Sequence, residues 1–301
     1  MINVYEQIDR NKRKSALVVV LFMFFVTLVA YIFSQILETG LSWVGLALIF
    51  TGLSSLGSYY WGDKIILAIS GARPAVREKD FQFYTVVENL CLVAQLPKPK
   101  LYVIEDSAPN AFATGRDPDH AVVCATTGLL NKLNRSELEG VIAHELSHVK
   151  NYDIRLMSIV TVLVGMVSLL ADWFMRNTYL SRGKRDRNKG GGLQAFLFII
   201  AIFLALLSPL IAKLIQLAIS RRREFLADAS AVMLTRYPEG LARALKKISV
   251  DREPLEAANK ATAHLYIVNP LRGQKFIGRF ANLFNTHPPV EERIKSLQEM
   301  S

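Results

Sequence analysis

The sequence predicts a mainly α-helical integral membrane protein that also carries a smaller α+β part in water. Three observations favour this class: the composition, four long apolar blocks, and the mixed polar segments that lie between and after these blocks. Of the 301 residues, 51% are hydrophobic and only 21% are charged. That balance excludes a disordered chain, and the lack of a Gly-X-Y period or a sustained heptad excludes collagen and coiled coil.

The two cysteines exclude a disulfide scaffold. Cys91 and Cys124 are 33 positions apart and form no CxxC motif, so they suit a reducing compartment or chemically inert thiols.

The first two apolar blocks predict a transmembrane helical hairpin. Residues 15–37 and 39–62 carry no charge, and each exceeds the roughly 20 residues that cross about 30 Å of hydrocarbon as a helix. Neither block has the periodicity of an amphipathic surface helix. A cleaved signal peptide is the alternative for the first block. Its apolar region is too long for one, and no small-residue cleavage site precedes Glu38.

Two further blocks predict helices in or beside the bilayer. One is uncharged over residues 156–171, the other over 190–212, and a basic loop at 176–189 separates them. We expect four spans, although this loop would then lie outside, against the preference of Lys and Arg for the cytoplasmic side. The alternative is that both helices are partly buried in protein and do not fully cross.

Residues 63–155 predict an α/β segment in water. Short alternating runs bounded by proline and polar residues indicate strands. We expect three strands and a turn around Pro109-Asn110, the strands lying at residues 101–103, 111–114 and 121–125. A helix is expected over 136–151, with Ser136 and Glu139 as a capping box at its start.

Within that helix, residues 144–148 read His-Glu-Leu-Ser-His, a spacing that indicates a metal site. His144 and His148 are four positions apart and face the same way, so both imidazoles can bind one zinc ion. Glu145 lies about 100° round the helix, which suits a general base better than a third ligand. The alternative is a pair of ordinary surface histidines. The apolar flanks predict a buried helix instead, where unpartnered histidines would be costly.

A catalytic zinc needs a third protein ligand and an open position. His120 follows a polar turn and His264 lies in an apolar stretch, so we expect solvation for the first and packing for the second. Glu224 and Asp228 share one face of a helix rich in small residues. That face could offer Glu224 to the metal and Asp228 to an imidazole N–H. The alternative for Glu224 is an ion pair with Arg221, Arg222 or Arg223, and spacing alone leaves both open.

These motifs resemble the HtpX family of bacterial membrane zinc metalloproteases, which are relatives of the CAAX prenyl endopeptidases. The resemblance covers nearly the whole chain. It includes the hairpin and four motifs in order, namely Asn110-Ala111-Phe112-Ala113-Thr114-Gly115, His-Glu-x-x-His, Arg223-Glu224-Phe225-Leu226-Ala227-Asp228-Ala229, and Thr286-His287-Pro288-Pro289 followed by Glu292-Arg293-Ile294. Some relatives carry histidine where this chain has Leu226, so that position is not a ligand here.

The resemblance implies a zincin-like α+β catalytic domain with a small sheet and an edge strand beside the metal helix. It places the third ligand on Glu224, and it implies that Asn110, Ala111, Phe112 and Ala113 bind an extended substrate as an added strand. It further implies that His287 faces the active site and stabilises an oxyanion. From the residues alone, His287 could equally be a solvated turn residue before two prolines.

Four parts of the chain are therefore expected. They are an N-terminal transmembrane hairpin (1–72), a cytoplasmic catalytic segment with the zinc helix (73–155), two further membrane helices with the basic loop (156–219), and a C-terminal cytoplasmic helical part that completes the zinc site (220–301).

The expected function is that of a membrane-embedded zinc endopeptidase with one Zn²⁺ per chain, and Glu145 as the group that takes and returns the proton. Substrates would be membrane proteins, their cytoplasmic segments or unfolded polypeptides, and the resemblance implies membrane-protein quality control under stress. One alternative is a prenyl-protein processing protease. Another is a zinc-stabilised scaffold or chaperone without turnover, against which Glu145 argues, because a structural site needs no base.

The expected location is the bacterial cytoplasmic membrane, with several spans and the active site facing the cytoplasm. Arg10, Lys12, Arg13 and Lys14 precede the first block and hold the N-terminus inside. The net charge of +10 then reflects contact with the lipid bilayer. No basic stretch interleaved with aromatics indicates a nucleic-acid partner.

Overall fold

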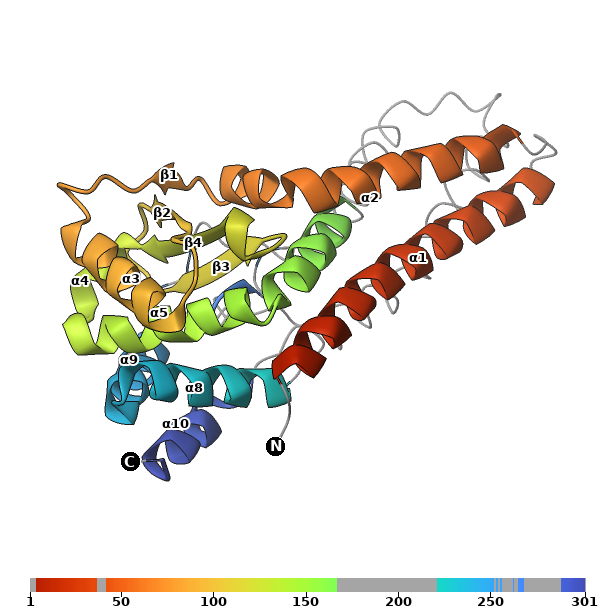
Figure 1. Ribbon diagram of the computed structural model, residues 1–301. Coiled ribbons are helices and arrows are strands. Elements are labelled where there is room, and N and C mark those ends of the chain that lie inside the picture. The colour runs from red at the N-terminus through yellow and green to blue at the C-terminus, as the bar shows by residue number, and fades with distance from the viewer. Residues whose placement is uncertain are drawn as a thin grey trace, which may run out of the picture.

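The computed structural model describes residues 4–36, 42–166, 221–251, 253, 255, 262, 265–267 and 288–300. Two long helices extend together from a part in which helices surround a small sheet (Figure 1). Within the ranges given, no helix combines the length and hydropathy that a membrane crossing requires.

The two long helices are α1 (Val4–Ile36) and α2 (Ser42–Ile69), which pack against one another as the predicted hairpin. Large apolar side chains on both remain exposed. On α1 they include Val20 and Phe24, which are 61% and 64% exposed, and on α2 Ile49 and Leu53, which are 61% and 65% exposed. The first turns of α1 lie near α8 (Arg221–Thr235), far along the sequence (Figure 1).

The sheet contains the three strands that alternation predicted. Strands β2 (Lys100–Ile104) and β4 (Ala121–Thr126) are parallel, while β3 (Ala111–Gly115) runs antiparallel to β4. A two-residue strand β1 (Arg73–Pro74) completes the order β1-β2-β4-β3. It was not predicted, because two residues, one of them proline, give no alternating pattern. Strand β3 therefore lies at one edge of the sheet.

Helix α5 (Arg135–Lys150) is the centre of the fold, with the sheet and α3 (Phe81–Ala94) on one side and α8 and α9 (Pro238–Val250) on the other. Two short helices, α4 (Thr127–Lys132) and α10 (Val290–Gln298), and a single 3-10 turn, η1 (Pro118–His120), lie among these elements. Helix α9 approaches so closely that a Cβ on Gly140 would lie 2.7 Å from the backbone nitrogen of Leu241. No larger residue fits at position 140 without moving α9.

The start of α5 corrects the predicted capping box. Asn134, not Ser136, is the N-cap, because its side chain accepts from the Glu137 N–H at 3.0 Å and Glu137 Oε2 accepts from the Asn134 N–H at 2.9 Å. Glu139 instead pairs with Arg135 at the surface. The helix thus begins one residue before the expected position.

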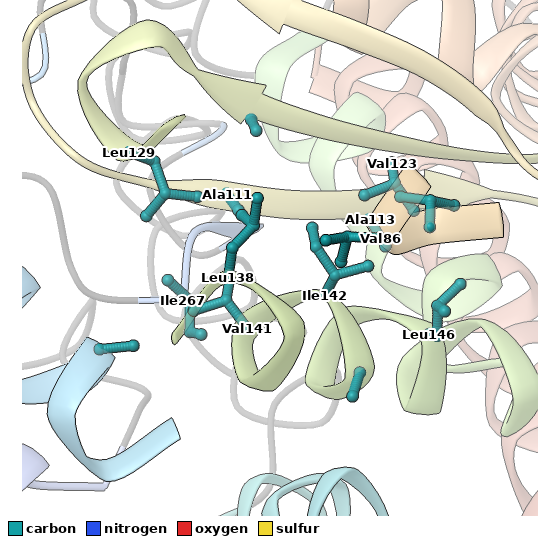
Figure 2. Packing of buried hydrophobic residues seen from close by; sticks show 14 of the residues in the cluster. Val86, Ala111, Ala113, Val123, Leu129, Leu138, Val141, Ile142, Leu146 and Ile267 are labelled. Atoms are coloured by element: carbon teal, nitrogen blue, oxygen red, sulfur yellow. The ribbon is translucent and has the colours of Figure 1, made fainter. Parts of the chain in front are cut away.

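Small side chains let β3 lie close to α5. Ala111 and Ala113 face Leu138 and Ile142 of the helix, with Ile267 beside them, in one buried apolar cluster (Figure 2). This packing sets the distance between the edge strand β3 and the helix α5, which carries both histidines.

The third apolar block is described only in part. Residues 153–166 are helical, and every residue from 156 to 165 is buried. The Ser58 hydroxyl of α2 donates to the Ile159 carbonyl, so this helix packs partly on the hairpin. Whether this block crosses a membrane stays a prediction, because its last part lies outside the described residues. The block at 190–212 lies outside the described residues.

Candidate metal centre

Three side chains from two helices meet at one point. His144 and His148 come from one face of α5, and Glu224 comes from the first turn of α8. The two Nε2 atoms are 3.2 Å apart, and the Glu224 oxygens lie 3.7 Å from His144 Nε2 and 3.6 Å from His148 Nε2. One possible ligand atom from each residue lies within 4.8 Å of the others. The group could therefore hold one metal ion.

In each imidazole the second nitrogen, Nδ1, contacts a carboxylate. His144 Nδ1 lies 2.9 Å from Asp228 Oδ1, and His148 Nδ1 lies 3.1 Å from Asp153 Oδ2. Each carboxylate accepts the Nδ1–H, so each Nε2 presents a lone pair to the centre. Two lone pairs and a carboxylate at these distances repel one another unless a cation or a proton lies among them. The donor set of two imidazoles and one carboxylate is the one that catalytic zinc uses.

Neighbouring charges shift the pKa values of the two buried histidines in opposite directions. Desolvation, with the positive charge of Arg293, lowers the pKa of His144 despite the contact with Asp228. Desolvation opposes protonation of His148 as well, but the bond to Asp153 and the charge of Glu224 outweigh it and raise its pKa to about 9. Positive charge is thus favoured at His148, beside Asp153 and Glu224, and disfavoured at His144, beside Arg293.

Glu145 lies beside this centre and not in it. It is buried, and its negative charge helps to raise the pKa of both His148 and Arg293. It follows His144 directly on α5, so it points away from the line that joins the histidines. A carboxylate near the ion but outside its ligand set is placed to exchange protons.

Arg293 of α10 is fully buried against the same site, which spacing along the chain gave no reason to expect. Its Nε and Nη2 donate to the two oxygens of Asp228 at 2.8 and 2.6 Å, and Nη2 lies 3.3 Å from His144 Nδ1. Such a two-point bond fixes the carboxylate in one orientation. Arg293 thus positions Asp228, which in turn orients His144.

Asp153 is held by a second set of contacts that was also missed. It accepts from Asn11 Nδ2 at 2.7 Å and from Arg223 Nη1 at 3.0 Å. Asn11 lies on α1 and is 1% exposed, so the hairpin contributes directly to the surroundings of His148. Asp153 follows the end of α5 and belongs to no recognisable pattern with the histidines.

The structure also locates other residues that the sequence analysis singled out. His120 is exposed and bonds Asp117, as expected for a solvated turn. Arg223 forms an ion pair with Asp153, and Arg293 Nη1 lies 3.7 Å from a Glu224 oxygen. Asn110 directly precedes the edge strand, which contains Ala111, Phe112 and Ala113. His264 and His287 lie outside the described residues.

Comparison with known proteins assigns the chain to a well-populated group. The model of "Peptidase family M48" matches residues 78–301. A "Protease HtpX homolog" of Dictyoglomus turgidum is 45% identical over 296 residues, covering 98% of this chain and 94% of its own. Another from Thermoanaerobacter pseudethanolicus is 44% identical over 301 residues, covering 99% and 98%. The crystal structure of S. mikatae Ste24p superposes with a TM-score of 0.49 at 20% identity, and the match spans 94% of this chain and 62% of that one.

Proposed function

The chain belongs to peptidase family M48, in which it is an HtpX-type metalloprotease, and from this premise we propose that it hydrolyses peptide bonds with one zinc ion held by His144, His148 and Glu224. The observation that supports this most strongly is the pair of imidazoles with Nε2 atoms 3.2 Å apart, each backed by its own carboxylate. A bound zinc would supply Lewis acidity and lower the pKa of a water to about 7.

The residues around the proposed ion have separate roles in the reaction. Asp228 and Asp153 hold the two imidazoles in the tautomer that ligates. Glu145 accepts a proton from the attacking water and returns it to the leaving amine. Burial of all these groups strengthens their electrostatic effect on the reacting peptide. His287 is proposed to stabilise the developing oxyanion, in line with the family resemblance.

The site is proposed to work at a membrane, on membrane proteins or their cytoplasmic segments. Large apolar side chains on α1 and α2 support this, since an exposed surface of this kind is costly in water and suits lipid. Asn11 links that hairpin to the surroundings of His148, which would keep the site close to the bilayer. Quality control of damaged membrane proteins is the corresponding proposed role.

The test is a Glu145→Gln variant of the full chain, purified in detergent and loaded with zinc. It should keep stoichiometric zinc and lose cleavage of casein and of a model membrane protein. Glu139→Gln is the matched control, because Glu139 lies on the same helix in a surface ion pair with Arg135. Cleavage by zinc-loaded Glu145→Gln at the rate of the control would refute the assignment of the base.

A further inference from the structure

A cavity of about 300 Å³ lies at the end of the hairpin from which the sheet follows. Its walls come from α2, the start of β2, the turn after β3 and the helix at 153–166. The α2 wall is residues 58–64, in which the uncharged block at 39–62 ends. None of the three candidate metal ligands lines the cavity, so it is separate from the metal centre.

Three cations line this cavity, namely Lys64, Lys100 and Arg116. Among the described residues, no carboxylate forms an ion pair with Lys64 or Lys100. Arg116 Nε lies 3.5 Å from one oxygen of Asp117, while the other oxygen is 2.6 Å from His120 Nδ1. Positive side chains with so little compensation attract an anion, and both Arg and Lys bind phosphate through charge-assisted hydrogen bonds.

The cavity also contains groups that a site for inorganic phosphate alone would not need. The carboxylates of Asp63 and Asp119 line it, and they suit the hydroxyl or ammonium group that follows the phosphate in a phospholipid headgroup. The rings of Tyr60 and Trp61 line it as well and are 51% and 54% exposed. Tyr and Trp rings are enriched where a protein meets the headgroup layer.

Pairs of cations and aromatic rings connect the two helices of the hairpin at this end. Arg155 lies 5.5 Å from the ring centroid of Tyr59 on α2 and 5.0 Å from that of Tyr152. Lys12 of α1 lies 4.6 Å from the Tyr152 centroid. The helix that carries Arg155 lies between α1 and α2 (Figure 1). Lys12 precedes the first apolar block and Tyr59 is near the end of the second, so this band has the composition and position of a membrane interface.

An apolar stripe on α2 leads away from the cavity. Five side chains at spacings of three and four residues share one face of this helix, namely Leu46, Ile49, Leu53, Leu56 and Tyr60. The four aliphatic members are 55–65% exposed. From the first member to the last the helix rises about 21 Å at 1.5 Å per residue, which exceeds half of a hydrocarbon core of about 30 Å. An acyl chain can therefore follow this stripe while its headgroup lies in the cavity.

We propose that the cavity binds the phosphodiester headgroup of one membrane phospholipid, with Lys64, Lys100 and Arg116 around the phosphate and an acyl chain along the stripe on α2. The bound lipid contacts α2, the turn after β3 and Ser158 together, so it holds the sheet against the hairpin at the membrane surface. This lipid site goes beyond the peptidase function and rests only on the proposed membrane location.

The test is a titration of the full chain in detergent with dioleoyl phosphatidylglycerol, followed by native mass spectrometry. One lipid should bind the wild type more tightly than any further lipid. Arg116→Gln should weaken this first binding by about tenfold, because it removes a charge-assisted hydrogen bond to the phosphate. Arg135→Gln removes the same charge from a surface ion pair on α5 and should leave the affinity unchanged. Equal affinities in the two variants would overturn the proposal.

Competitors and a second variant separate the headgroup from the acyl chain and from free phosphate. Neither dioleoylglycerol, which lacks the phosphate, nor a large excess of inorganic phosphate should displace the first lipid, and displacement by either would overturn the proposal. Leu56→Ser should lower the affinity severalfold, whereas Val20→Ser on the exposed face of α1 should not; equal affinities here would overturn the placement of the acyl chain. A chain that stays in solution without detergent would contradict the proposed membrane location instead.

Discussion

Replacing Arg293 by methionine should cost much of the stability of the protein. Arg293 is fully buried, and its bond to Asp228 joins two charges that are both removed from water. Removing one partner leaves the Asp228 carboxylate with the imidazole of His144 as its remaining side-chain contact among the described residues. Breaking a buried pair in this way costs about 3–5 kcal/mol, against a total of roughly 5–15 kcal/mol for a typical domain.

A double-mutant cycle separates the charge pair from general packing. Asp228→Asn alone removes the closest partner of the buried Arg293 charge and leaves it with Glu224, whose Oε2 is 3.7 Å from Nη1, so this variant should also destabilise. The double variant leaves neither charge unpaired, and its loss should fall short of the sum of the single losses by at least about 1 kcal/mol. The assay is denaturant unfolding of the purified chain in detergent, without added metal.

The exposed pair of Arg135 and Glu139 provides the control for this cycle. Its N···O distance of 3.0 Å is similar, but the Arg135 side chain is 58% exposed, and Arg135→Met should cost no more than about 1 kcal/mol. Additive losses in the Arg293 and Asp228 cycle would refute the reasoning, because they would show that the two charges do not stabilise one another.

Three further predictions concern the site and the hairpin. Glu224→Ala should lower bound zinc well below one per chain, as measured by metal analysis. The control Glu239→Ala, on the exposed face of α9, should keep its zinc. Equal zinc in both variants would exclude Glu224 as a ligand. Asn11→Ala should weaken zinc binding by about tenfold in a competition with a chelator, because it removes a donor to the carboxylate that holds His148; unchanged affinity would show that the hairpin does not support the site. Asp80 should contribute stability that depends on pH: burial opposes its ionisation, but Arg73 and the Val76 N–H outweigh burial and lower its pKa. That contribution is complete above the unfolded-state pKa of about 3.9, and it is lost as the pH falls through the lower pKa of the folded state. The difference in unfolding free energy between wild type and Asp80→Asn should therefore shrink on acidification. A difference that stays constant with pH would contradict this.

The parts of the fold that were predicted from the sequence depend on short-range patterns. The spacing of His144 and His148 places both on one helix face without any tertiary information, and alternation identified β2, β3 and β4. The capping box was misplaced because two overlapping patterns, starting at Asn134 and at Ser136, differ by two residues and both suit an N-cap.

The residues that support the metal ligands could not be found in this way. Asn11, Asp153 and Arg293 lie on three separate segments, and only packing of the whole chain brings them to the histidines. None belongs to a periodic pattern whose chemistry points to zinc. Arg293 was included in a motif that resembles the family, but its contact with Asp228 follows only from the position of α10 against α8.

The measurement that tests the account most directly is X-ray absorption at the zinc edge of the purified, zinc-loaded chain, compared with its Glu224→Ala variant. For the wild type we expect two imidazole nitrogens at about 2.0–2.1 Å from zinc, together with oxygen neighbours. No sulfur neighbour is expected, because Cys91 and Cys124 are buried elsewhere. The Glu224→Ala variant should lose an oxygen neighbour or the metal itself. A spectrum with a sulfur ligand, with a single imidazole, or without change on removal of Glu224 would contradict it.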